Sequence, residues 1–169
     1  MRGYVTDGAG GRWLLPEAVA WRLEYTAGVP CDSFWIRCPW SRENTANPAA
    51  WVRFEAQQEG ERVFTGVVDE CQVSQNEGGG LLEVSGRGMA ALLLDNEALG
   101  QDYGTATLED ILRDHVEPYG IAAAPGASLP AVSPFSVSTG SSEWSVVYEF
   151  ARYYGGIAPR FDREGRLVL

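Results

Sequence analysis

Hydrophobic and polar residues alternate over short segments in the first half of the chain, as they do in strands with one buried face. The clearest case is residues 19–26, where Val19, Trp21, Leu23 and Tyr25 fall on one side and the residues between them on the other. Further strands are predicted at residues 4–6, 33–38, 51–57, 63–73 and 81–85. About six strands joined by short turns predict an antiparallel barrel or sandwich.

Glycine, proline and small polar residues mark the connections between these strands. Turns are predicted at residues 7–11, 27–32 and 59–60, and a polar loop at residues 39–50. Three consecutive glycines in residues 75–80 predict a hairpin tip that is longer than a two-residue turn. The chain is then expected to turn at residues 86–88 and to form a short helix over residues 88–95.

Helical periodicity is confined to the second half of the chain. A helix is predicted over residues 107–116, where Thr107 can act as the N-cap with Asp110 three residues later in a capping-box relation. Its apolar stripe consists of Leu108, Ile111, Leu112 and His115. Pro118 and Gly120 follow and end the helix.

A last helix is expected to begin at Ser141 or Ser142 and to stop at the glycine pair 155–156. The predicted buried stripe of this helix consists of Trp144, Val147, Tyr148, Ala151 and Tyr154. Before it, residues 121–140 predict an extended segment with a short strand at residues 136–138. After it, residues 157–161 and 166–169 predict a closing hairpin.

The predicted fold is therefore α+β and mainly β, an antiparallel β-barrel or split barrel with two or three short helices. We expect a barrel-like domain at residues 1–100, which includes the helix at 88–95. A helix-containing second subdomain is expected at residues 101–169, ending in the hairpin.

Charge narrows the classes of partner. The net charge is −10, which argues against specific nucleic-acid binding because phosphate contacts need a basic surface. All 13 basic residues are Arg, which is favoured at protein interfaces because its planar head forms paired hydrogen bonds. Apolar runs are too short to span a membrane, and the N-terminus lacks a basic-then-apolar signal.

Cysteine and histidine are too few and too scattered for a structural metal site. The cysteines are Cys31, Cys38 and Cys71, the only histidine is His115, and no C-x-x-C motif is present. We therefore expect reduced thiols, no metal and no cofactor. His115 lies on an apolar stripe of the predicted helix, so we expect a structural role or a place at the solvent edge.

Two acidic pairs and one glycine motif were weighed as catalytic or binding sites. Asp69 with Glu70, and Asp95 with Glu97, could flank a glycosidic bond, but acids at strand and helix ends are common. Residues 86–91 match the dinucleotide fingerprint in its G-x-G-x-x-A form. The match lies among predicted antiparallel hairpins and lacks the parallel βαβ unit that the motif needs, so a structural role is favoured for both.

Several segments resemble one known family. The similar segments are residues 63–70 (VFTGVVDE), residues 82–98 (LEVSGRGMAALLLDNEA), the helix beginning TLEDIL, and the ending ARYYGG followed by APRFDREGRLVL. They are similar to the baseplate hub proteins of phage tails, the late-control-D type. These proteins are related to the hub-and-spike proteins of contractile injection systems. The positions that carry the resemblance are Val84, Gly86, Arg87, Asp95, Ala98, Asp162, Gly165 and Leu167. It covers roughly residues 50–169, and relatives usually continue further, which implies a truncated or short member.

The resemblance implies a structural, non-enzymatic component of the virion tail or baseplate, made in the host bacterial cytoplasm. Its implied partners are further copies of the chain in a homotrimer, the tail tube protein, and spike or tail-tip proteins. The candidate interface or corner residues are Arg87, Trp51, Phe64 and Trp144. The alternatives are a carbohydrate-binding β-module that uses Trp35, Trp40, Trp51 and Trp144, or a small cell-wall hydrolase.

Overall fold

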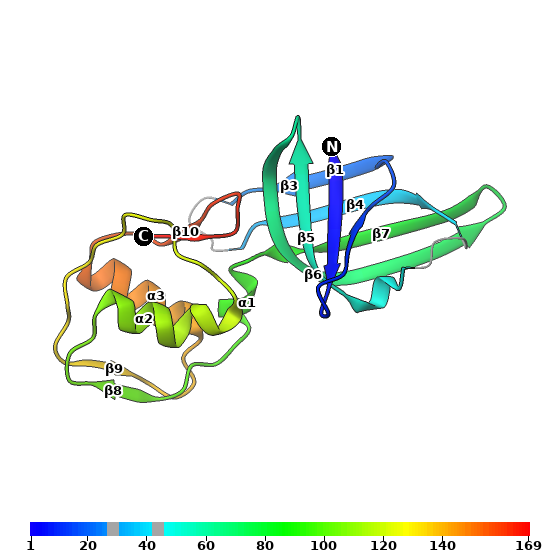
Figure 1. Ribbon diagram of the computed structural model, residues 1–169. Helices are drawn as coiled ribbons and strands as arrows, with labels where there is room; N and C mark the ends of the chain where they lie inside the picture. Colours follow the sequence, from blue (N-terminus) through cyan, green and yellow to red (C-terminus); the bar gives the residue numbers. More distant parts are fainter. Residues whose placement is uncertain (27–30, 42–45) are drawn as a thin grey trace. The chain divides into compact units, whose positions relative to one another are not determined.

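The chain forms two compact units, Met1–Gly88 and Met89–Leu169, in the computed structural model (Figure 1). The structure describes residues 1–26, 31–41 and 46–169. The first unit ends before residue 100, the boundary predicted for the first domain, because the short helix α1 (Ala91–Leu94) packs against helix α3 of the second unit. The predicted turn at residues 27–32 and loop at residues 39–50 lie partly outside the described residues.

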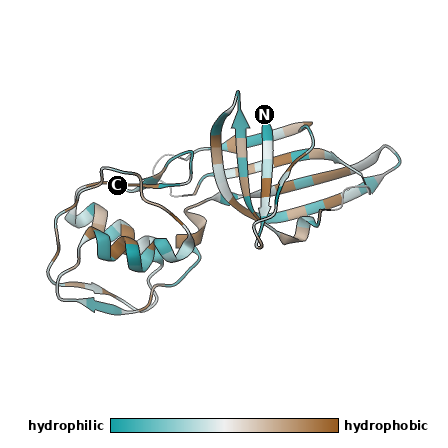
Figure 2. Ribbon diagram, in the orientation of Figure 1, coloured by the Kyte–Doolittle hydropathy of each residue, from teal (hydrophilic) through white to brown (hydrophobic). Residues whose placement is uncertain are grey.

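The first unit is a seven-stranded sheet in which all neighbouring strands are antiparallel. In spatial order its strands are β2 (Arg12–Leu14), β1 (Arg2–Asp7), β5 (Trp51–Gln58), β6 (Glu61–Asn76), β7 (Gly79–Gly88), β4 (Ser33–Trp40) and β3 (Ala20–Glu24). A short 3-10 helix, η1 (Pro48–Ala50), precedes β5. Figure 2 shows hydrophobic and hydrophilic positions alternating along several of these strands, as the sequence pattern predicts.

The sheet curls over so that its two halves face each other across one core. Phe34 of β4 and Phe54 of β5 are not on neighbouring strands, yet their rings stack with centroids 4.0 Å apart. Gly3 of β1 lies against Ile36 of β4 for the same reason. The prediction of a mainly β protein with an antiparallel sheet is confirmed, but β2 and β3 do not pair and the sheet does not close into a barrel.

The hairpin β5–β6 is confirmed, and a two-residue turn makes it. Glu59 and Gly60 both have positive φ angles, 53° and 86°, which match the right-handed twist of the flanking strands. The hairpin β6–β7 differs from its prediction. Asn76 pairs with Gly79, so this tip is also a tight turn, and the strands extend into the glycine-rich segment.

The predicted turn at residues 86–88 is wrong, because β7 continues through Gly88. Glycine is needed here for close packing of two strands: a Cβ on Gly86 would lie 2.0 Å from the Val67 carbonyl oxygen of β6. A β-bulge between Val68 and Glu70 lies beside this point. The glycines therefore let β6 bend where its pairing passes from β5 to β7.

Strand β3, predicted from the clearest alternation in the sequence, lies at an edge of the sheet and is not well buried. Val19, Trp21 and Tyr25, expected on the buried side, are 61%, 48% and 53% exposed. Alternation correctly identified the strand and the side that faces the core, because Leu23 is half-buried against the core and the Tyr25 ring lies 6.0 Å from that of Phe64. At the edge of the sheet the described residues cover that side only in part. Strand β4 passes through Pro39, which was expected to end it, because Pro39 lies beyond the last pairing of β4 with β3.

The second unit packs helices against short strand pairs. Its elements are α1 (Ala91–Leu94), β8 (Gln101–Tyr103), α2 (Leu108–His115), η2 (Glu117–Tyr119), β9 (Phe135–Val137), α3 (Glu143–Glu149), the π-helical turn η3 (Phe150–Tyr154), β10 (Arg160–Phe161) and β11 (Leu167–Val168). β8, which was not predicted, pairs with β9, which matches the strand predicted at residues 136–138. β10 pairs with β11 as the predicted closing hairpin. The expectation of two or three short helices is confirmed.

Helix α2 matches its prediction, including the capping box in which the Thr107 side chain accepts from the Asp110 N–H and the Asp110 side chain accepts from the Thr107 N–H. Helix α3 begins at the expected place, and Trp144, Val147 and Ala151 are buried. Tyr148 and Tyr154, predicted in the same stripe, are exposed, and Phe150, three residues after Val147, is buried. The π-helical turn that begins at Phe150 shifts the phase of the residues after it, which turns Tyr154 away from the stripe.

Among the described residues, no helix is long and apolar enough to cross a membrane.

Candidate functional site

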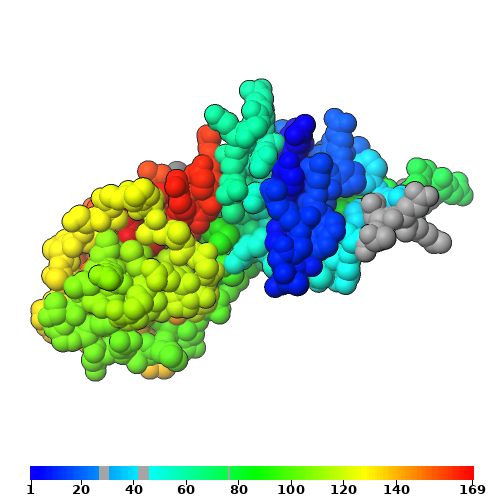
Figure 3. Space-filling view, in the orientation of Figure 1, coloured from blue at the N-terminus to red at the C-terminus, as the bar shows by residue number. Residues whose placement is uncertain are grey.

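The two open edges of the sheet carry exposed apolar side chains. Leu14 of β2 is 58% exposed, and Trp21 of β3 is 48% exposed, with Val19 next to it. Figure 3 shows the N-terminal strands, in blue, at the surface of the first unit. An edge strand presents unpaired N–H and C=O groups to any strand that approaches it. These edges can therefore bind another β-strand with both backbone and apolar contacts.

Arg87, a candidate interface residue, forms a bidentate ion pair inside the sheet surface. Its Nε lies 2.8 Å from Asp69 Oδ2 and its terminal nitrogen 2.9 Å from Asp69 Oδ1, across the bulge of β6. Both side chains are more than one third exposed, so solvent weakens the pair. Arg87 lies within strand β7 and not at a corner, and a contact between subunits stays a prediction.

The other three candidate interface residues are buried within the chain. Phe64 lies in the core of the first unit against Phe34 and Phe54. Trp144 is buried in the second unit against Tyr148 and Phe161. Their contribution to an interface between subunits stays a prediction, and burial assigns both a role in core packing.

Trp51 lies beside a hollow of about 330 Å³ on the first unit. Trp13, Trp40 and Trp51 line it together with Glu17, and Trp40 packs edge-on against Trp51 at 6.0 Å. The indole Nε1 of Trp51 is the one buried side-chain nitrogen or oxygen without a hydrogen-bond partner in the described part of the chain. An unpaired buried donor is costly and marks a place where an acceptor would be favoured.

A buried polar network links four elements of the second unit. His115 of α2 is 3% exposed, and its Nδ1 lies 2.6 Å from Glu143 Oε2 of α3. Tyr119 of η2 donates to Glu143 Oε1 at 2.9 Å. Tyr103 of β8 lies 3.1 Å from His115 Nε2 and donates to Asp114 at 2.9 Å. The network thus ties β8, α2, η2 and α3 together.

Tyr103 joins the histidine to a second carboxylate. Its hydroxyl donates to Asp114, whose pKa is lowered by the hydrogen bond from Arg113. The same Tyr103 oxygen contacts His115 Nε2, and His115 Nδ1 contacts Glu143. Burial, together with Asp114, raises the pKa of Tyr103, and burial, together with Glu143, raises that of Tyr119.

This network crosslinks the unit, because His115 is buried and both of its ring nitrogens contact side chains of other elements, Tyr103 of β8 and Glu143 of α3. The structural role expected for His115 fits this arrangement. Its carboxylate partner is 28 residues away in the sequence, and no local pattern could have identified it.

The acidic pairs considered as catalytic groups make contacts within their own unit. Glu70 accepts from Gln72, and Glu97 accepts from the Gly140 N–H. The three cysteines form no disulfide. Burial raises the pKa of Cys38 to about 11, and burial together with Glu70 raises that of Cys71 to about 11. Within residues 1–26, 31–41 and 46–169, no group of three or more His, Cys, Asp or Glu could hold a metal.

Three solved structures share the fold over nearly the whole chain. The 43 kDa tail protein of prophage MuSo2 from Shewanella oneidensis matches with a TM-score of 0.78, 19% identity and 99% of this chain covered. A tail protein from Neisseria meningitidis matches with a TM-score of 0.74, 21% identity and 98% coverage. A prophage tail protein from Listeria monocytogenes matches with a TM-score of 0.58, 13% identity and 99% coverage.

The chain spans about half the length of these proteins, 52%, 50% and 50% respectively. At these identities the likeness shows a shared fold. No family model matches the sequence, and no curated protein matches it.

Proposed function

We propose that this chain is a structural component of a phage or prophage tail, placed at the baseplate hub or tail tip between the tail tube and the spike. The observation that carries the proposal is the fold shared with two tail proteins, one of them from a prophage, over 98–99% of the chain. The open edges of the sheet support it, because they provide a means of assembly through strand pairing.

Assembly would proceed by pairing of β2 or β3 with a strand of a neighbouring subunit. Leu14, Val19 and Trp21 would then be buried in the contact, which gives their exposure a physical reason. A homotrimer built this way would offer a ring to the tail tube protein on one side and to a spike or tail-tip protein on the other. The net charge of −10 suits a channel wall that repels DNA phosphate.

Gene deletion and complementation test this function. Particles induced without the gene should lack tails or carry tails that stop at the tip in electron micrographs, and the wild-type gene should restore them. Complementation with Trp21→Lys, which places a charge on the β3 edge, should fail. Tyr153→Lys, which alters a more exposed aromatic side chain in the second unit, 76% exposed, should succeed. Normal infectious tails without the gene would overturn the proposal.

A second candidate function is saccharide binding in the hollow lined by Trp13, Trp40 and Trp51. Indole faces stack on the C–H faces of sugars, and the unpaired Trp51 N–H and the Glu17 carboxylate could bond hydroxyls. Titration of the chain with envelope oligosaccharides, followed by tryptophan fluorescence, tests it. Saturable quenching that Glu17→Gln weakens would support binding, and no change with any sugar would exclude it.

A further inference from the structure

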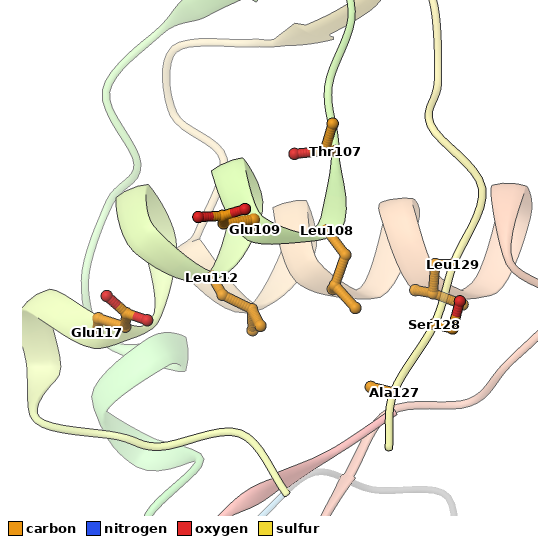
Figure 4. A pocket seen from close by; sticks show the side chains of 8 residues that line it. All are labelled: Thr107, Leu108, Glu109, Leu112, Glu117, Ala127, Ser128 and Leu129. Atoms are coloured by element: carbon orange, nitrogen blue, oxygen red, sulfur yellow. The ribbon is translucent and has the colours of Figure 1, made fainter. Parts of the chain in front are cut away.

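A groove in the second unit lies between helix α2 and residues 127–129, far in sequence from the sheet edges. It has a volume of about 440 Å³. Figure 4 shows Leu108 and Leu112 of α2 pointing toward the segment that carries Ala127 and Leu129. These four side chains are only partly buried, although Leu108 and Leu112 belong to the apolar stripe of the helix. The floor of the groove is therefore apolar and open.

The rim of the groove is acidic and exposed to solvent. Glu109 and Glu117 both line it, and neither side chain makes an ion pair or hydrogen bond in the described part of the chain. Glu109 lies in the first turn of α2 and Glu117 in the first turn of η2, where the helix dipole favours an acid. Both side chains are exposed, so their charges are accessible to a cationic partner.

The opposite wall offers an unpaired backbone. Ala127, Ser128 and Leu129 make no hydrogen bond with any described residue, whether through the main chain or the side chain. The segment is nevertheless held in place. The Leu129 side chain packs against Gly155 and fills the space that a side chain at position 155 would need. Three residues later, Val132 exchanges two backbone hydrogen bonds of 2.8 and 2.9 Å with Ala106. A fixed segment with free N–H and C=O groups can accept an added strand.

We propose that this groove binds an extended, basic segment of a partner protein. One aliphatic or aromatic side chain of the segment fits between Leu108 and Leu112, and its backbone pairs with residues 127–129. Arg or Lys residues flanking the anchor lie against Glu109 and Glu117. Charge complementarity selects this partner: residues 89–169 contain 11 Asp and Glu against 5 Arg, which attracts a cationic segment and repels an acidic one.

Backbone NMR of the whole chain with designed peptides tests the proposal. The probe is a capped hexapeptide of alternating Arg and Leu. One control peptide replaces Arg by Glu, and another replaces Leu by Ala. The Arg-Leu peptide should shift the amide signals of Leu108, Leu112 and residues 127–129, with an affinity that falls as salt rises. Both control peptides should bind at least several-fold more weakly.

Chain variants separate the rim from the floor. The double variant Glu109→Gln and Glu117→Gln should weaken binding by about threefold or more and reduce its salt dependence. Leu112→Ser should weaken binding at every salt concentration, whereas Glu149→Gln, an exposed acid of α3, should leave the affinity unchanged.

Three results would overturn the proposal: no shifts in the groove with millimolar peptide, equal binding of the Glu-Leu peptide, or equal binding by the double variant. Shifts of the same amides on raising the protein concentration alone would assign the groove to a second copy of the chain instead. None of these outcomes depends on the proposed role in a tail.

Discussion

Replacing Glu143 with glutamine should destabilise the second unit, because Glu143 is the acceptor on which the buried network converges. Its side chain is 8% exposed and accepts hydrogen bonds from His115 at 2.6 Å and from Tyr119 at 2.9 Å. Glutamine keeps the shape and one acceptor oxygen but removes the negative charge. The His115 proton shared with Glu143 then loses its anionic partner.

The expected cost can be bounded from the contacts. A hydrogen bond to a charged group contributes about 1.5–3 kcal/mol, and removing one partner of a buried ion pair costs about 3–5 kcal/mol. Because glutamine preserves part of the hydrogen bonding, Glu143→Gln should cost about 2–3 kcal/mol. Glu143→Ala leaves His115 unpaired and opens a cavity, so it should cost about 3–5 kcal/mol.

Urea unfolding followed by circular dichroism at 222 nm measures this cost. The signal reports the second unit, since α1, α2 and α3 all lie within it. With a urea slope of about 1–1.5 kcal/mol per M, the midpoint should fall by roughly 2 M. Glu149→Gln on the same helix, whose side chain is exposed and makes no bond with a described residue, should change stability by less than about 0.5 kcal/mol.

A double-mutant cycle with His115→Gln decides whether the two residues act together. The coupling energy between Glu143 and His115 should be about 1–3 kcal/mol, because each single change already breaks the bond that the other would remove. Additive effects, or a Glu143→Gln variant as stable as the Glu149→Gln control, would refute the view that this pair holds the unit together.

Three further changes test other parts of the molecule. Gly86→Ala should lower the free energy of unfolding of the first unit by about 1–3 kcal/mol in urea, because the added Cβ would lie 2.0 Å from the Val67 carbonyl oxygen of β6. Gly8→Ala should be nearly neutral, because the space around Gly8 is open. The hydrogen bond from Arg113 lowers the pKa of Asp114 in the folded chain. The ionised Asp114 carboxylate therefore stabilises the fold above its unfolded pKa, and this stabilisation is lost as the pH falls through the lower folded pKa. The Asp114→Asn variant should lose less stability than the wild type between pH 6 and pH 3. Cys38 is fully buried with a pKa of about 11, so a thiol reagent at pH 8 should label it only after unfolding, and rapid labelling of the native chain would contradict its position in the core.

The sequence alone was enough to predict the local elements. Alternation identified β3 and β4, the pair Glu59 and Gly60 identified a tight hairpin, and Thr107 with Asp110 identified the start of α2. These features depend on residues that are close in the chain, such as a cap, a turn or a two-residue period. Local physical chemistry therefore determines them before the rest of the molecule is in place.

Only the tertiary structure decided which faces are covered and which distant groups meet. Alternation places Val19 and Trp21 on the core-facing side of a strand, but the position of β3 at an edge leaves these two side chains exposed. Gly86 suggested a turn, yet it permits the close approach of β6 and β7. His115 meets Glu143 because α2 packs on α3. Such contacts join residues far apart in the chain, so they depend on how the elements pack, which the sequence pattern of each element does not contain.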